Sequence, residues 1–320
     1  MGFASFFLAA LSLVSLSVSA QRAPKIASPT SKALLWQISG KQLTKPSYVF
    51  GTMHLVCADN LPVSPLVKQA LANTEQLILE LNTDSPTMGE EMRAHMSLPA
   101  GQTVQTCMSP QEYTTVNNYF VNELKMPFDK MHGLKPLFLA TMLFPKLLGC
   151  TPGSYEMALV EAAHAQKKEV LGLETVAEQM GAFDQMPCEQ QARMLVDMVG
   201  KYGEAQKEFA RMAALYQAQD VEGLFVTIRD SKFGMRALEA ELLTNRNKRW
   251  LPQIAEQAAT KPTFFAVGAA HLGGPEGVLA LLRRQGYQVK PVRTQTKDSR
   301  KTKESKNADN DAFILMIGGN

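Results

Sequence analysis

Two histidines lie in a pattern that the chain contains twice, once near its start and once near its end. The copies cover residues 45–55 and 261–272. In each, Lys-Pro and a small hydroxyl residue precede a short aromatic and β-branched run, and Gly, further small or flexible residues, His and Leu follow. The run is typical of a buried strand, and the glycine allows a sharp turn where the strand ends. His54 and His271 are therefore expected at the carboxyl ends of two strands, where open α/β sheets place their sites.

Two glutamates occupy comparable positions in other short apolar runs. Glu80 interrupts the run over residues 76–81, and Glu174 lies near the end of the run over residues 168–175. Burying a carboxylate is costly unless a partner or a metal compensates its charge, so Glu80 is expected to belong to a site. Glu174 has a second interpretation, since a carboxylate there would also favour the dipole of a helix that begins at Thr175.

Imidazole and carboxylate groups together suit a divalent transition metal that keeps one position open for water. The candidate ligands are His54, Glu80, Glu174 and His271. Such a metal lowers the pKa of its bound water and polarises a carbonyl oxygen, which is the chemistry of hydrolysis. The same residues without a metal could act as general bases on water. The chain has no helical H-E-x-x-H signature, so this prediction depends on the placement of the residues at strand ends.

Short strands and helices alternate around these positions, which predicts an α/β fold with a central, mostly parallel sheet. Besides the second copy of the pattern, strands are predicted over residues 33–38, 48–50, 76–81, 168–175 and 287–292. The first two form a hairpin that leads to His54. A helix that Pro62 and Pro65 open, and that runs to about Asn73, then completes a β-α-β unit, and hence a parallel pair of strands. A helix over residues 275–285, with Pro at its start, precedes the last strand.

Two long stretches, residues 85–167 and 176–259, are mostly helical in pattern and predict flanking helices together with a large helical insertion. Ser109 and Glu112 have the spacing of a capping box at a helix start. Residues 134–148 are strongly apolar but contain two prolines. This segment is too short and too interrupted to span a bilayer, so a buried helical hairpin is predicted.

The pattern of the N-terminal residues indicates an export signal. Residues 3–20 carry no charge and end in Val-Ser-Ala before a polar segment, which is typical of a signal peptide. A membrane anchor is the alternative, although the apolar stretch is short for a span. We therefore expect a signal peptide over 1–20, a polar leader over 21–32, a folded domain over 33–292 and a disordered basic and polar tail over 293–320. The mature protein is expected to be periplasmic or secreted, without a stable membrane span.

The four cysteines fit an oxidising compartment. Cys57, Cys107, Cys150 and Cys188 are well separated and include no CxxC pair, which suits disulfides better than a zinc cage. Four cysteines allow three pairings, and the sequence does not choose among them. Cys57 follows His54 by three residues, so a disulfide there could brace the loop that carries the histidine.

The net charge of +3 indicates no particular partner. Basic residues in the tail are interleaved with acidic ones, and no aromatic platform accompanies them, which argues against nucleic-acid binding. The oligomeric state is not specified by the sequence.

The ordered motifs resemble the TraB/GumN family, whose relatives include the Tiki-type metalloproteases and, more remotely, the erythromycin esterases. The resemblance covers residues 33–292 and is carried by residues 51–54, 79–81, 172–175, 246–247 and 268–272. It implies a hydrolase domain with an α/β core, a helical insertion and a site made from the two Gly-x-x-His motifs plus glutamate. The family often shows Gly-x-Asp after the apolar hairpin, where this chain has Gly-Ser-Tyr-Glu, which leaves a supporting role for Glu156 open.

For the Tiki-type members the resemblance implies metal-dependent peptide cleavage, with manganese or cobalt favoured and zinc possible in principle. His54, His271, Glu80 and Glu174 would then be the metal ligands. Arg246 would bind the oxyanion or a substrate carboxylate, supported by hydrogen bonds from Asn247. On the residues alone, Arg246 and Asn247 also fit the surface of a helix.

The leading hypothesis is an exported, metal-dependent peptidase that acts on a peptide or another small hydrolysable substrate. A metal-free esterase or amidase that uses the same histidines and glutamates is the second hypothesis, and the esterase relatives imply such chemistry. A non-enzymatic envelope protein that binds a ligand in the same cleft is the third. Sensitivity to chelators separates the first two, and tolerance of Glu80→Gln would favour the third.

Overall fold

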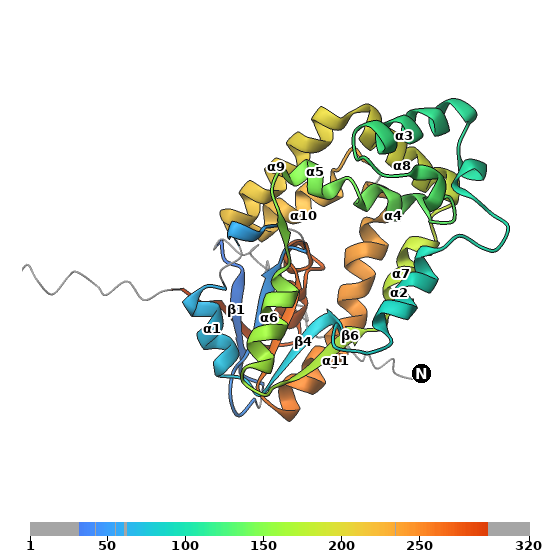
Figure 1. The fold of residues 1–320 in the computed structure, drawn as a ribbon. Coiled ribbons are helices and arrows are strands. Elements are labelled where there is room, and N and C mark those ends of the chain that lie inside the picture. Colours follow the sequence, from blue (N-terminus) through green and yellow to red (C-terminus); the bar gives the residue numbers. More distant parts are fainter. Residues whose placement is uncertain (1–31, 42, 55, 61–62, 234, 294–320) are drawn as a thin grey trace, which may run out of the picture.

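The computed structural model of the chain describes residues 32–41, 43–54, 56–60, 63–233 and 235–293. The predicted signal peptide over residues 1–20 lies outside the described residues, as do the leader before residue 32 and the tail after residue 293. The described part has a central sheet with helices on both faces and a further group of helices at one end (Figure 1).

Six strands form the central sheet: β1 (Leu35–Ser39), β2 (Ser47–Thr52), β4 (Gln76–Leu81), β6 (Glu169–Glu174), β7 (Thr263–Gly268) and β8 (Gln288–Pro291). Their order across the sheet is β6-β4-β7-β2-β1-β8. Strands β6, β4, β7 and β2 are parallel, and β1 is antiparallel to both β2 and β8. The predicted α/β fold with a mostly parallel sheet is therefore confirmed, and so is the hairpin of β1 and β2.

The predicted β-α-β unit needs one correction, because β2 and β4 are parallel but are not neighbours. Strand β7 lies between them and pairs with both. Its register with β2 pairs Tyr48 with Phe264 and Thr52 with Gly268. The two copies of the repeated pattern are therefore adjacent strands of one sheet. Local sequence patterns could not reveal this, since β7 comes from the far end of the chain.

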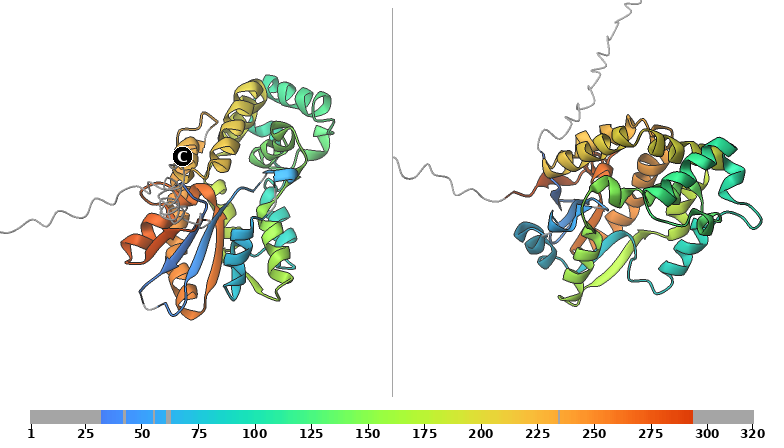
Figure 2. Two further views of the ribbon diagram at one scale, coloured as in Figure 1. Left: turned by 90° about the vertical axis from the view of Figure 1, so that its left-hand side faces the viewer. Right: turned by 45° about the horizontal axis from the view of Figure 1, so that its top comes forward.

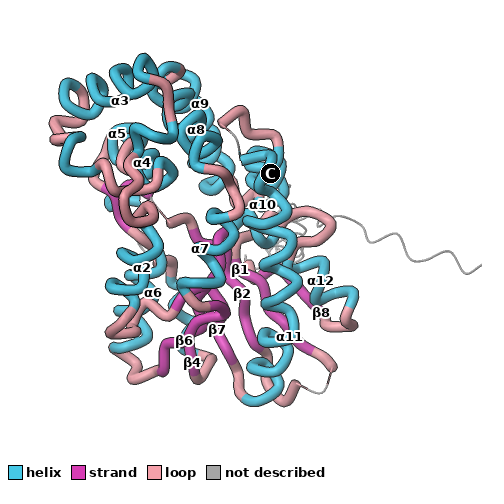
Figure 3. Tube along the Cα trace, turned by 90° about the vertical axis from the view of Figure 1, so that its right-hand side faces the viewer, coloured by secondary structure: helices cyan, strands magenta, loops and turns pink. Residues whose placement is uncertain are grey.

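Helices cover both faces of the sheet (Figures 2 and 3). Helices α1 (Pro65–Ala72) and α6 (Tyr155–His164) lie on one face, and α11 (Asn245–Thr260) and α12 (Val278–Arg284) lie on the other. Helix α12 begins later than the predicted start at residue 275, because a turn that closes between Gly274 and Gly277 precedes it. Gly274 has a φ of +78°, which favours glycine.

The remaining α-helices are α2 (Met88–Met96), α3 (Pro110–Asn122), α4 (Pro136–Thr141), α5 (Phe144–Leu148), α7 (Val176–Asp184), α8 (Cys188–Gly200), α9 (Tyr202–Gln217) and α10 (Val221–Arg229). Of these, α3, α4, α5, α8 and α9 gather at one end of the sheet, and we call them the helical lobe (Figure 1). The lobe has its own apolar core, which includes Phe120, Phe128 and Leu195. The segment predicted as an apolar hairpin forms the two short helices α4 and α5, and the capping box at Ser109 is present.

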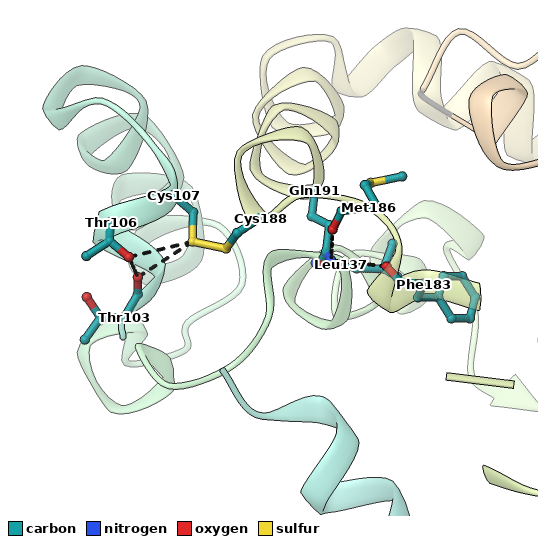
Figure 4. Close-up of a disulfide and its surroundings, with 8 residues drawn as sticks. All are labelled: Thr103, Thr106, Cys107, Leu137, Phe183, Met186, Cys188 and Gln191. Atoms are coloured by element: carbon teal, nitrogen blue, oxygen red, sulfur yellow. Dashed lines mark hydrogen bonds between the residues drawn. A yellow bond between two sulfur atoms is a disulfide. The ribbon is translucent and has the colours of Figure 1, made fainter. Parts of the chain in front are cut away.

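All four cysteines form disulfides, Cys57–Cys150 and Cys107–Cys188. The second joins the turn before α3 to the first residue of α8 within the helical lobe (Figure 4). The first links β3 (Val56–Cys57), which follows His54, to the segment before β5 (Pro152–Gly153), and these two short strands pair. Two disulfides are compatible with an exported protein.

Among the residues that the structure describes, no helix is both long enough and apolar enough to cross a membrane.

We predict that removing the lobe disulfide lowers stability without changing the fold. The double substitution Cys107→Ala/Cys188→Ala releases a long loop in the unfolded chain, which typically costs about 2–4 kcal/mol of unfolding free energy. Urea denaturation under non-reducing conditions measures the loss. Peptide mapping of the unreduced wild type should recover the two pairs stated above. An unchanged unfolding midpoint in the variant, or a different pairing in the wild type, would contradict the structure.

Candidate active site

His54, Glu80 and His271 converge around one glycine at the carboxyl edge of the sheet. His54 follows β2, Glu80 is part of β4, and His271 lies in a short 3-10 turn (Ala269–Leu272) directly after β7. A Cβ atom placed on Gly268, the last residue of β7, would lie 3.3 Å from Glu80 Oε1, 3.4 Å from His271 Cδ2 and 3.7 Å from His54 Nε2. The absence of a side chain at Gly268 therefore leaves a space that these three side chains border.

The glycine of the first copy has a different function. Because the second copy contains one more residue before its glycine, the sheet pairs Gly51 with Val267 and not with Gly268. A Cβ on Gly51 would lie 2.9 Å from the Cα atom of Ala269. Gly51 thus makes room for the turn that carries His271.

Glu80 is buried and remains ionised. Its Oε1 accepts a hydrogen bond from the Gly268 N–H (2.7 Å) and lies 3.7 Å from His271 Nε2. Its Oε2 accepts from Arg246 Nη2 (2.6 Å). Burial alone would raise the pKa of Glu80, but the Arg246 guanidinium, the two imidazoles and the Gly268 N–H outweigh it and hold this pKa well below its usual range.

Arg246 bridges Glu80 and Glu174. It lies in the first turn of α11, directly after a π-turn over Ala240–Thr244, and its side chain is buried. Its Nη2 also donates to Glu174 Oε1 (2.5 Å), and its Nε donates to the same carboxylate (3.0 Å). Its Nη1 donates to the Leu242 carbonyl oxygen and lies 3.2 Å from His271 Nε2. The guanidinium also lies 4.7 Å from the centre of the Trp250 ring, within the range of a cation–π contact.

The structure contradicts one of the alternative interpretations and limits another. Arg246 and Asn247 are 5% and 2% exposed, so they do not lie on a helix surface. Glu174 does not cap α7, since Thr175 is the N-cap residue and accepts from the Glu178 N–H. Glu174 is instead held by Arg246 and by Trp250 Nε1 (3.1 Å).

His271 is neutral, with its proton on Nδ1. The amide nitrogen of Asn247 donates to the carbonyl oxygens of His271 and Glu276, which leaves Asn247 Oδ1 to accept from His271 Nδ1 (2.7 Å). Burial is the main reason that the pKa of His271 is lowered to about 3, and the charge of Arg246 acts in the same direction against the opposing effect of Glu80. His271 Nε2 therefore carries a lone pair at neutral pH.

His54 is oriented by Glu156, near the start of α6. His54 Nδ1 lies 2.9 Å from Glu156 Oε1, which also accepts from Thr52 Oγ1 (2.7 Å). The side chain of His54 is 67% exposed, so desolvation is weak there, and the hydrogen bond and the charge of Glu156 raise the pKa of His54 above its usual value. Burial would raise the pKa of Glu156, whereas its hydrogen bond with His54 helps to lower it to about 2. The role that the sequence left open for Glu156 is thus contact with His54.

The disulfide Cys57–Cys150 constrains this contact. Cys57 follows His54 by three residues, and Cys150 precedes Glu156 by six. The bond therefore joins the two chain segments whose ends present the imidazole and its carboxylate. The sequence predicts such a constraint on the loop that carries His54, because Cys57 is only three residues away.

The donors around Gly268 fit a divalent transition metal in kind. The Nδ1 atom of each imidazole contacts an oxygen, that of Glu156 for His54 and that of Asn247 for His271. Contacts of this kind orient the Nε2 atom of a histidine toward a metal. Two imidazole nitrogens and one carboxylate oxygen are a common donor set for such ions. In the described parts of the chain, however, no group of three or more His, Cys, Asp or Glu side chains is arranged closely enough to hold a metal ion. A metal would also have to replace the contact between His271 Nε2 and Arg246.

Sequence reasoning missed two supporting residues, Gln179 and Trp250. Gln179 Nε2 donates to Glu80 Oε2 and to Glu174 Oε1, both at 3.1 Å. Trp250 lies one helical turn after Arg246 and is fully buried. The spacing of four residues between Arg246 and Trp250 places both on one face of α11, and this was the available signal.

Comparisons with known proteins agree with these motifs. The model of the TraB/PrgY/gumN family matches residues 34–291. Metalloprotease TIKI1 of Danio rerio is 22% identical over 315 residues, which cover 80% of this chain and 62% of that protein. Metalloprotease TIKI2 of Danio rerio is 23% identical over 316 residues, which cover 80% of this chain and 60% of that protein. The chain thus spans about three-fifths of the length of these curated relatives. No solved structure matches the chain.

We predict that Arg246→Met strongly destabilises the protein, because it leaves Glu80 and Glu174 buried without their cation. Breaking a buried ion pair in this way typically costs about 3–5 kcal/mol. Denaturant unfolding measures the loss. The matched control is Arg229→Met, which removes an exposed pair with Asp230 and should have little effect. Equal losses in the two variants would contradict the assigned role of Arg246.

Proposed function

Because the chain belongs to the TraB/PrgY/gumN family, as its motifs predict, we propose that it is a metal-dependent hydrolase that cleaves peptide bonds. Distant homology to the two Tiki metalloproteases suggests a hydrolase or peptidase-like function. The observation that carries the proposal is the space at Gly268, which His54 Nε2, Glu80 Oε1 and His271 border.

In this proposal His54, Glu80 and His271 hold the metal. When bound there, a divalent ion would activate a water molecule and polarise the carbonyl oxygen of the substrate. The family resemblance favours manganese or cobalt, with zinc as a further candidate. Glu174 was also expected to be a ligand, but its contacts with Arg246 and Trp250 favour a supporting role.

The chain itself supplies orientation and charge. Glu80 is kept ionised by Arg246, so it can bind a cation. Asn247 and Glu156 fix the ring orientations of His271 and His54. The donor groups of Arg246 are engaged by Glu80, Glu174, Leu242 and His271, which leaves none for a substrate oxyanion in this arrangement. We therefore assign Arg246 a positioning role in place of the oxyanion contact expected from the sequence.

Metal-free hydrolysis is a second candidate, and one observation favours it. The groups at Gly268 are not closed around a metal position, while the carboxylate of Glu80 and the His54 imidazole that contacts Glu156 already border the same space. In this version Glu80 would accept the proton of the attacking water, and His54 would protonate the leaving group.

We further propose that the protein acts outside the cytoplasm, in the periplasm or as a secreted protein. The two disulfides support this location, since such bonds persist in oxidising compartments.

Metal content and peptide hydrolysis test the proposal together. Wild type is expected to bind about one manganese, cobalt or zinc ion per chain and to lose hydrolysis in the presence of a chelator. His54→Ala and His271→Ala should each lose the metal and the activity, because each removes a donor. Substrates are screened from a library of internally quenched peptides.

His164→Ala is the matched control for His54→Ala, since both histidines have exposed side chains paired with a carboxylate, that of Asp84 for His164 and that of Glu156 for His54. It should retain both metal and activity. Hydrolysis that persists in the chelator but is lost in both site variants would favour the metal-free candidate. Hydrolysis that persists in either site variant would contradict the whole site assignment.

A further inference from the structure

A cavity of about 380 Å³ adjoins the candidate site and extends into the helical part of the molecule. Thr52, His54, Gly268, His271 and Arg246 form its wall at the site. Apolar side chains of the helices form most of the rest, among them Phe144, Phe183, Met194, Met198, Phe209 and Met212. A volume of this size is typical of a ligand pocket and exceeds that of one side chain.

The basic groups on this wall already have carboxylate partners within the protein, and the one carboxylate has a hydroxyl partner. Arg246 is paired with Glu80 and Glu174, and His54 is paired with Glu156. Glu208 accepts a hydrogen bond from Ser231 Oγ (2.6 Å). An anionic group entering the cavity would lose its hydration without gaining a new counter-charge, which is unfavourable. An apolar group would gain from burial, and the methionines can adapt to its shape.

A second cavity, of about 480 Å³, lies next to the first. The two share Met53, Leu147, Phe209 and Tyr216 as lining residues, so they adjoin each other at the segment that leads into His54. The second cavity has a more polar wall, which includes Ser64, Gln217 and Gln219. A ligand that fills both cavities would therefore be a chain that is apolar in one part and more polar in the next. A peptide has this property, and a uniform hydrocarbon tail does not.

We infer that the first cavity accommodates consecutive bulky apolar side chains of a peptide, immediately beside the bond to be cleaved. The inference rests on the proposed peptidase function, which it narrows to substrates with large aliphatic or aromatic residues at that position. Residues on the other side of the bond face the second cavity, where polar side chains are accepted. The pocket thus discriminates against acidic side chains at the position next to the bond.

Binding without turnover tests this inference. The full chain is titrated calorimetrically, in the presence of a chelator, with two capped hexapeptides that differ only in their central pair, Leu-Phe or Ser-Asn. The Leu-Phe peptide is expected to bind about tenfold or more tightly than the other. Met212→Lys places a charge on the wall of the first cavity and should remove this preference. Met212→Gln serves the same purpose if the lysine variant does not fold.

Met157→Lys is the matched control, because Met157 is a 60% exposed methionine outside both cavities. It should leave the preference unchanged. Equal affinity for the two peptides, no binding of the Leu-Phe peptide, or tighter binding of dodecanoate than of either peptide would overturn the inference. A preference for Leu-Phe in a protein that hydrolyses no peptide would uphold the pocket assignment and reject the proposed function, so the two failures are distinguishable.

Discussion

Arg246 is a cation buried between two carboxylates, and the geometry of the site depends on it. Its charge helps to hold the pKa of Glu80 well below the usual range, and its guanidinium also pairs with the buried carboxylate of Glu174. Buried ion pairs contribute little net stability, since desolvation offsets most of the attraction. In this site the ion pairs instead fix the positions of the carboxylate oxygens. Arg246 directs one oxygen of Glu80 away from the histidines, so that the other remains beside Gly268 and His271.

A second constraint is the adjacency of β2 and β7, which turns a repeated sequence pattern into a paired site. The two strands pair from Tyr48 and Phe264, each of which is three residues after the lysine of its copy, and one additional residue in the second copy moves its glycine beyond Gly51. This offset separates the functions of the two glycines. Gly51 lets the turn after β7 approach, and Gly268 leaves space among the candidate ligands.

Much of this arrangement could be predicted from the sequence, because its signals are local. The strand over residues 76–81 has the expected bounds, and Glu80 belongs to it. The placement of His54 and His271 at strand ends followed from Gly-x-x-His after an apolar run. Sequence patterns could not show that β7 inserts between β2 and β4, or that Arg246 points inward, because both depend on pairings across the whole chain. The disulfide pairing was beyond reach for the same reason.

The central claim is that three side chains meet at the space beside Gly268 to hold a metal. Cobalt(II) titration of wild type and Gly268→Ala, followed by visible absorption, tests this without removing any donor. The added methyl group would lie 3.3–3.7 Å from Glu80, His271 and His54. We predict that wild type binds cobalt, that Gly268→Ala loses this binding while keeping its thermal stability, and that Gly181→Ala, which has open space around it, behaves like wild type. Unchanged cobalt binding in a folded Gly268→Ala variant would contradict the account.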